Sequence, residues 1–264
     1  MENKLLTVFL ASNLGIVAAF AATGAWAVEG GNFDLATGFD YSSGKYGSAS
    51  ATSIFSIPVT GRYMTGLWVF KLTVPYVRIS GTTDVVSGGK RFRAITTTAT
   101  TTVSTTRSGL GDVVAAATYD AYSGSEDDFG IYLTGRVKFG TADTSLGTGQ
   151  NDYAAQADVY QGFDSFTAMG ALGYEVLGST AGVDMNNVVY GTIGGDFQFT
   201  GQTSSGAEMR LSQKPSAAGA GQRELTVYAS HRIGESLSVR GYALKGFSDG
   251  SPDSGFGVMV SSDF

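Results

Sequence analysis

The sequence contains one histidine, His231, which directly follows Ser230. A histidine beside a serine suggests the base and nucleophile of a hydrolase. In an extended strand, however, consecutive side chains point to opposite faces, so these two groups cannot act on the same substrate. The surrounding segment alternates as a strand does. The His231 ring falls beside a short turn, where it suits a membrane–water interface. We therefore predict no catalytic residue and no enzyme activity.

Carboxylates occur in several polar segments without gathering in one of them. Asp143 and Asp152 lie in one glycine-rich segment, and Asp249 and Asp253 lie in another. Calcium binds several carboxylate and carbonyl oxygens at once, and the spacing of an EF-hand loop is missing here. Aspartates in such segments commonly accept hydrogen bonds from their own backbone. We predict neither a metal site nor a cofactor.

Other charged residues recur at every second position of segments that alternate between polar and apolar residues. Within residues 129–139, Leu133 falls on the apolar face of a strand, whereas Arg136 and Lys138 fall on the opposite face. Further strands repeat this division. The charges predicted on the polar face are Arg62, Lys71, Arg136, Lys138, Asp158, Asp196, Glu208, Arg210 and Glu224.

If these strands close into a barrel with the polar face inward, the charges line its lumen. Cations then gather on one wall and carboxylates on the facing wall, and such a field selects solutes by charge. Arg210, which shares a face with Glu208, breaks this segregation and favours some pairing. The alternative is that the charges pair and fill a barrel too narrow to conduct. Tyr132, Tyr160 and Tyr228 share the polar face and are predicted to contact solutes.

The elements that must position these residues are strands with a two-residue period. An even number of antiparallel strands, joined alternately by short turns and long polar loops, is typical of a bacterial outer-membrane barrel. The period predicts about twelve such strands, with ten or fourteen as alternatives. The predicted strands are 33–41, 53–64, 67–77, 111–121, 129–139, 153–161, 166–175, 187–199, 207–213, 224–232, 237–244 and 255–264.

Two regions are irregular in this pattern. Pro58 and Pro75 fall inside predicted strands, where proline removes a ladder hydrogen bond, so we expect local bulges there. The longest connection, 80–107, contains a threonine-rich run at 95–103. It fits an outer loop, a plug inside the barrel, or extensions of the flanking strands.

The composition agrees with a sheet protein. The chain has 264 residues with 38 glycines, 13 tyrosines and 16 phenylalanines, and only 15% of its residues are charged. Its net charge of −6 is opposite to the basic surface that binds nucleic acid, and it contains no cysteine for a disulfide. No stretch after residue 27 reaches the roughly 18 apolar residues of a membrane helix. A membrane protein without helices must close its sheet to pair every backbone group.

The N-terminus has the features of a secretory signal peptide. Lys4 precedes an apolar run over 5–22, and residues 25–27 form the small-x-small pattern that a signal peptidase cleaves. An uncleaved anchor is the alternative. We predict a signal peptide at 1–27 and a single outer-membrane β-barrel domain at 28–264.

The last predicted strand ends on an aromatic residue. Phe256, Val258, Val260 and Phe264 alternate on one face, and outer-membrane barrels generally carry such a strand as their assembly signal. The predicted partners are the lipid bilayer of the outer membrane, the outer-membrane assembly machinery through the strand ending in Phe264, and a small-molecule solute, without nucleic acid.

Short motifs along the chain match one known pattern. They are IPV at 57–59, YMTGLW at 63–68, VPYV at 74–77, SGLGD at 108–112, GRVKF at 135–139, LGTG at 146–149, Asp152 and YALKGFSDGSPD at 242–253. Together they resemble an outer-membrane β-barrel family named for the meta pathway of phenol degradation, whose members are often described as transporters. Those members commonly carry a proline where Gly140 begins the segment 140–142 here. The resemblance implies a barrel that passes small aromatic or hydrophobic molecules.

The sequence thus predicts an all-β fold, a transmembrane antiparallel up-and-down β-barrel in the bacterial outer membrane. The predicted function is a channel or facilitator for the passive passage of small solutes, among them small aromatic or hydrophobic compounds. The alternative is a non-conducting structural or partner-binding barrel that acts through its outer loops. A soluble periplasmic barrel or sandwich is the remaining possibility.

Overall fold

The computed structural model describes residues 31–81, 85–87, 92–94, 104–124, 128–179 and 184–264. The predicted signal peptide and the threonine-rich run lie outside these residues. Within them, no helix is long and apolar enough to span a membrane. The strands are β1 (Asn32–Gly44), β2 (Thr52–Thr65), β3 (Trp68–Gly81), β4 (Val85–Ser87), β5 (Phe92–Ala94), β6 (Thr105–Leu110), β7 (Val114–Ser123), β8 (Phe129–Lys138), β9 (Asp152–Phe163), β10 (Phe166–Val176), β11 (Val188–Thr200), β12 (Thr203–Ser212), β13 (Gln222–Ile233), β14 (Leu237–Gly246) and β15 (Ser254–Asp263).

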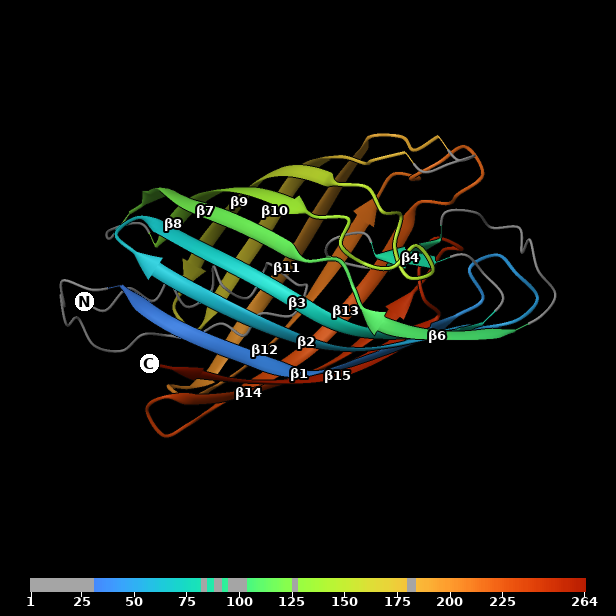
Figure 1. Cartoon of the computed structure of the whole chain (residues 1–264). Helices are drawn as coiled ribbons and strands as arrows, with labels where there is room; N and C mark the ends of the chain where they lie inside the picture. Colours follow the sequence, from blue (N-terminus) through green and yellow to red (C-terminus); the bar gives the residue numbers. More distant parts are fainter. Residues whose placement is uncertain (1–30, 82–84, 88–91, 95–103, 125–127, 180–183) are drawn as a thin grey trace.

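Twelve of the described strands close into an antiparallel barrel. β1 to β3 and β7 to β15 pair in chain order, and β15 pairs back onto β1 between residues 34–43 and 254–263. Short turns lie at one end of the barrel and long loops at the other (Figure 1). The predicted up-and-down barrel of about twelve strands is therefore confirmed.

The two-residue period sorts side chains onto two faces of the wall. In β8 the side chain of Leu133 is 48% exposed, whereas that of Arg136 is only 7% exposed. In the centre of β11, Ile193 is 70% exposed. Strands of 10 to 14 residues, tilted by about 40°, rise by about 25–35 Å, the height of an apolar bilayer core. The outer surface is thus built to face lipid.

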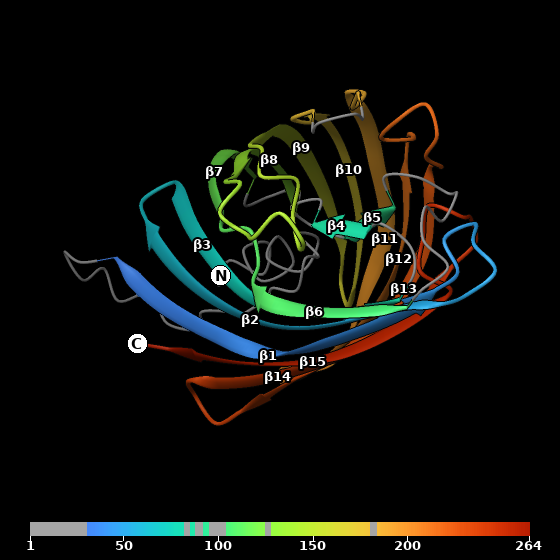
Figure 2. The same ribbon diagram turned by 45° about the vertical axis from the view of Figure 1, so that its right-hand side comes forward.

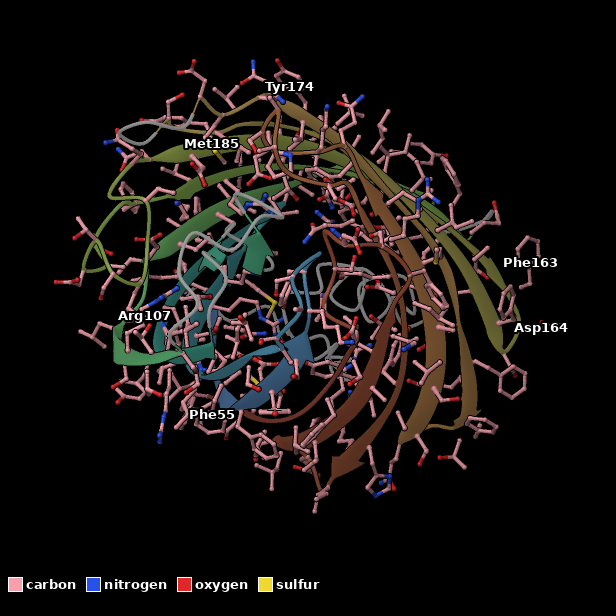
Figure 3. All side chains as sticks on the ribbon, turned by 90° about the vertical axis from the view of Figure 1, so that its right-hand side faces the viewer. Phe55, Arg107, Phe163, Asp164, Tyr174 and Met185 are labelled. Atoms are coloured by element: carbon pink, nitrogen blue, oxygen red, sulfur yellow. The ribbon has the colours of Figure 1, made fainter. Side chains whose placement is uncertain are left out.

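Aromatic side chains mark both ends of this apolar surface. Tyr63 and Trp68 flank the β2–β3 turn, and Phe163 and Phe166 flank the β9–β10 turn. At the loop end, Tyr174 is again exposed, and Phe163 and Tyr174 both lie on the outside of the wall in Figure 3. Belts of exposed aromatic side chains at both ends are typical of the two membrane–water interfaces of an outer-membrane barrel.

One position in the wall differs from the prediction. The predicted strand 111–121 begins only at Val114, and a separate strand, β6, precedes it. β3 pairs with β7 along residues 68–73 and with β6 along residues 76–81. Within the described chain β6 pairs with β3 alone, because β8 pairs with β7 and β9. We call this discontinuity between β6 and β8 the seam; Figure 2 shows β6 following β3 apart from β8.

The two prolines explain where the ladders are interrupted. Pro58 and Pro75 lie directly opposite each other in β2 and β3, without the predicted shift in register. The β1–β2 ladder keeps one register but has a gap at Gly38 and Phe39. Pro75 lies where β3 changes partner, and its carbonyl accepts the Gly111 N–H at 2.8 Å. Each missing N–H thus falls at an interruption of pairing, so no bulge between β2 and β3 is needed.

The long connection after β3 extends the flanking strands in part. Ser80 and Gly81 continue β3, and β6 begins at Thr105. Between them β4 and β5 pair as a separate short hairpin at the loop end of the barrel (Figure 1).

Candidate functional site

The polar residues predicted from the alternation lie on the inner face of the wall. Eight of the nine predicted charges are buried, and Lys71 is half-buried. Tyr132 and Tyr160 are 1% exposed and meet edge to face, with ring centroids 5.5 Å apart. Tyr228 is buried separately in β13. A role of these residues in lining a solute pathway remains a prediction.

Several interior residues were missed by the sequence analysis. Four of them occupy the same polar phase of their strands, so the alternation that predicted the other residues was the available signal, whereas Asp112 lies between β6 and β7. The missed residues with buried side chains are Asp34, Asp112, Glu175, Tyr190 and Arg240.

The charges form ion pairs between strands one or two places apart in the wall instead of separating onto facing walls. Arg62 forms an ion pair with Asp34 of β1. An Arg136 Nη2 atom lies 3.2 Å from Glu175 Oε1. The predicted segregation of cations from carboxylates is therefore wrong, because the order and register of the strands place acids of β1 and β10 beside cations of β2 and β8.

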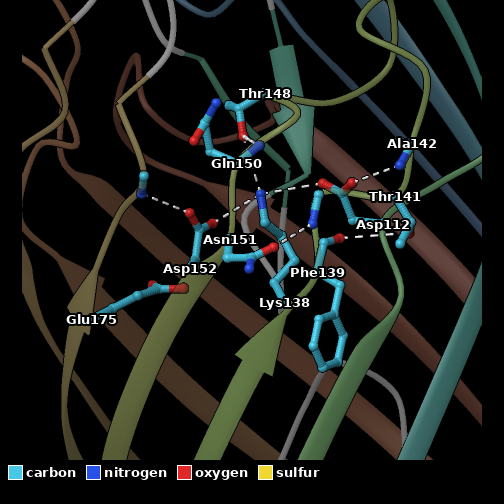
Figure 4. Close-up of polar contacts among 12 residues, drawn as sticks. Asp112, Lys138, Phe139, Thr141, Ala142, Thr148, Gln150, Asn151, Asp152 and Glu175 are labelled. Carbon is cyan, nitrogen blue, oxygen red and sulfur yellow. Dashed lines mark hydrogen bonds and ion pairs between the residues drawn. The ribbon is translucent and has the colours of Figure 1, made fainter.

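Lys138 forms the most connected of these pairs. Its Nζ atom lies 3.2 Å from Asp112 Oδ2, 3.0 Å from Asp152 Oδ2 and 3.3 Å from Thr148 Oγ1 (Figure 4). Lys138 is 1% exposed and Asp112 is fully buried. We call Lys138, Asp112, Asp152 and Thr148 the Lys138 clamp. Because the group is buried, removal of one charge leaves the others without compensation.

The Lys138 clamp attaches the loop after β8 to the seam. Asp112 Oδ1 accepts the Ala142 N–H at 3.0 Å. The Phe139 N–H donates to the Val113 carbonyl at 2.8 Å, and the Val113 N–H donates to Thr141 Oγ1 at 2.9 Å. The segment between β6 and β7 is therefore held by the 139–151 loop where strand pairing is lacking.

The same loop contributes apolar residues to the interior. Leu146 is 3% exposed, and a Cβ atom added at Gly109 of β6 would lie 3.2 Å from its Cδ1 atom. Leu146 thus lies against the inner side of the seam. We call the group to which it belongs the inner apolar cluster. Its members are Tyr46, Ile54, Val77, Ile79, Ala142 and Leu146.

Two tyrosines are each sandwiched between a glycine and an arginine. Tyr190 lies directly opposite Gly173, and the Arg210 Cζ atom lies 4.4 Å from the centre of its ring. Tyr228 repeats the arrangement, opposite Gly206 and with the Arg240 Cζ atom 3.7 Å from its ring centre. We call these the Gly–Tyr–Arg stacks.

Tyr190 is also fixed at its hydroxyl group. It donates to Gln156 Oε1 at 2.9 Å, and Gln156 in turn donates to Asp158 Oδ1 at 2.6 Å. Cation–π contact together with these hydrogen bonds orients the ring and the guanidinium group on the inner wall.

Adding a methyl group at Gly173 should displace the Tyr190 ring. A Cβ atom there would lie closer than 3.0 Å to three atoms of the Tyr190 side chain, two in the ring and the hydroxyl oxygen. We expect Gly173→Ala to lower the free energy of unfolding by about 1–3 kcal/mol, as overpacking does. The matched control is Gly135→Ala, because a Cβ atom at Gly135 has no neighbour within 4 Å. Urea titration in lipid vesicles, followed by tryptophan fluorescence, measures both; equal effects would contradict the stack.

The structure places the residues that were considered for catalysis and for metal binding. His231 is exposed and its Nδ1 atom lies 2.9 Å from Thr203 Oγ1, whereas Ser230 lies on the other face. Among the described residues, no group of three acids or histidines is placed to hold a metal. In the outer loop, the Ser145 N–H donates to Asp143 Oδ1 at 2.8 Å and holds the pKa of Asp143 below its ordinary value. Asp143 thus makes the local backbone contact predicted for it.

The lipid-facing belt, the closed sheet and the charged interior together define an integral β-barrel of the bacterial outer membrane, with the lipid bilayer around its apolar surface. A family model described as "Putative MetA-pathway of phenol degradation" matches residues 28–260, so the chain belongs to this family. The resemblance inferred from the short motifs is confirmed.

Solved structures support the same fold. An outer membrane channel from Pseudomonas putida F1 is similar with a TM-score of 0.68 and 12% identity, over 90% of this chain and 97% of that chain. The translocator domain of the autotransporter NalP from Neisseria meningitidis is similar with a TM-score of 0.51 and 12% identity, over 98% of this chain and 93% of that chain. No curated protein matches the sequence.

Proposed function

We propose that this protein is a passive channel or facilitator for small solutes in the outer membrane, and that small aromatic or hydrophobic compounds are among them. The observation that carries this proposal is a polar and charged inner wall within a closed barrel whose outer face is apolar. Such an interior suits a pathway for solutes, since lipid contact requires none of these groups. The family's description refers to phenol degradation, and this supports small aromatic compounds as the solute class.

The interior offers two kinds of surface on different parts of its wall. At the loop end, the inner apolar cluster and the 139–151 loop lie against β2, β3 and the seam. On the wall formed by β11 to β14, arginines and tyrosines present cations and aromatic faces. An apolar surface and a polar, aromatic surface within one interior suit solutes that have an apolar body and one polar group.

The competing function is a barrel that does not conduct and acts through its outer loops. The observation that favours it is the close packing of the interior, where Arg62, Lys138 and Arg240 are each 1% exposed. Neither function requires a catalytic residue, a metal or a cofactor.

Swelling of liposomes separates the two functions. Protein purified from outer membranes is incorporated into liposomes loaded with an impermeant polymer, and swelling is followed in arabinose, glycine or phenol. A channel gives swelling that decreases with solute size, and empty liposomes give the background rate. If protein-containing liposomes swell no faster than empty ones in every solute, the passive-channel proposal is wrong.

We also propose that the last strand serves as the signal for the assembly machinery. Phe264 is 76% exposed, and its N–H donates to the Phe33 carbonyl at 2.8 Å, so its ring faces outward beside the first strand. Phe264→Ala should reduce the amount of folded barrel in outer membranes. Heat-modifiable migration on a detergent gel measures it, with Phe199→Ala, an exposed ring on another strand, as control. Equal levels for both variants would argue against this role.

A further inference from the structure

Three cations of the inner wall share one row across four neighbouring strands. Arg62 lies directly opposite Lys71 in the β2–β3 ladder. Lys71 lies opposite Ala116 of β7, and Ala116 lies opposite Arg136 of β8. Neighbouring strands are about 4.8 Å apart, so Lys71 lies about 5 Å from one cationic position and about 10 Å from the other along the row. In this row, Ala116 is the residue between Lys71 and Arg136.

The three cations differ in how they are compensated. Arg62 is paired with Asp34, and Arg136 is paired with Glu175. For Lys71, no carboxylate among the described residues lies within the 4.0 Å of an ion pair. Lys71 is also half-buried, whereas the other two are buried. The row therefore carries one half-buried lysine that the described wall leaves without an acid.

The positions around Lys71 are occupied by hydroxyl groups and small apolar side chains. The inward neighbours on its own strand are Val69 and Thr73. Thr73 shares a hydrogen bond of 2.9 Å with Thr60 of β2. On the β7 side, Thr118 lies opposite Val69 and shares a hydrogen bond of 2.9 Å with Thr134. An ammonium group among hydroxyls and small apolar groups suits an anion that carries a small apolar body.

We propose that Lys71, between Arg62 and Arg136, forms a binding site for small organic anions with an apolar body, such as aromatic carboxylates. The proposal rests on the channel function for its role in passage, because it names the solute that the path favours. A single lysine side chain offers one point contact to an anion, which is weak enough for release, as transport requires. The two flanking guanidinium groups raise the local positive potential without needing to leave their own acids.

Equilibrium dialysis of protein from outer membranes in detergent tests the site itself. The probes are radiolabelled benzoate and the uncharged benzamide. We expect benzoate to bind more tightly than benzamide, and Lys71→Gln to weaken benzoate binding about tenfold while leaving benzamide unchanged. Lys71→Arg should restore the preference for benzoate. The control is Lys245→Gln, which makes the same change at an exposed residue of β14.

The outcomes separate this inference from the channel proposal. If wild-type protein does not prefer benzoate, or if Lys71→Gln binds benzoate like wild type while remaining heat-modifiable, the anion site is wrong even when liposomes swell. If benzoate binds through Lys71 but liposomes do not swell, the site stands and the channel proposal falls. Loss of preference in Lys71→Gln alone, with Lys71→Arg and Lys245→Gln like wild type, is the expected result.

Discussion

Replacing Lys138 by methionine is expected to lower the free energy of unfolding by about 3–5 kcal/mol, because the change leaves two buried carboxylates facing each other without a cation. Asp112 and Asp152 both lie within 3.2 Å of the Lys138 Nζ atom. Methionine nearly preserves the length of the side chain, so the effect measures the charge. Denaturant titration in lipid vesicles gives the free energy, and limited proteolysis within residues 139–151 reports release of the loop.

Two further variants distinguish the clamp from a general loss of charge. In the triple variant Lys138→Met, Asp112→Asn, Asp152→Asn the uncompensated charges are gone, and we expect at least half of the lost stability to return. Lys245→Met removes a lysine from an exposed position and should change stability by less than about 0.5 kcal/mol. If Lys138→Met is no less stable than Lys245→Met, the Lys138 clamp does not hold the loop.

Placing an arginine at Ile193 is expected to destabilise the barrel by about 2–4 kcal/mol, because this position lies near the middle of the lipid-facing surface. Ile193 is 70% exposed in the central part of β11. A guanidinium group there must leave water for hydrocarbon, a cost that no neighbouring residue on the outer face offsets. Unfolding in lipid vesicles measures the change.

The matched control uses the same strand and the same face at a different depth. Phe199 lies near the end of β11 and is 61% exposed, so Phe199→Arg should cost only about 0–1 kcal/mol. Equal costs at the two depths would mean that this face does not contact the bilayer core. A soluble monomer in the absence of detergent would lead to the same conclusion.

The faces of the strands could be predicted because the period of a strand is a local property. Leu133 and Arg136 are three residues apart and had to point to opposite sides whatever the partners of β8 are. The aromatic ends of strands and the alternation of short and long connections followed from the same reasoning. Barrel closure was predictable because open sheet edges are unfavourable in lipid.

The seam could not be predicted because it depends on which strand pairs beside β3. Residues 105–110 and 114–123 both have strand-like sequences, and only the change of partner at Pro75 separates them. The ion pairs could not be predicted for the same reason. Whether Arg136 meets Glu175 depends on the register of three strands, and a charge pattern along one strand does not contain that register.

The pairing of β1 with β15 has a consequence for how the protein is delivered. β1 and β15, the outermost barrel strands in chain order among the described residues, form one ladder, so the wall is sealed only when β15 has paired with β1. Before this pairing, the chain exposes two unpaired strand edges and an apolar outer surface to water. Copies of the chain would associate under these conditions. The topology therefore leaves the chain open to association with other copies until β1 and β15 have paired.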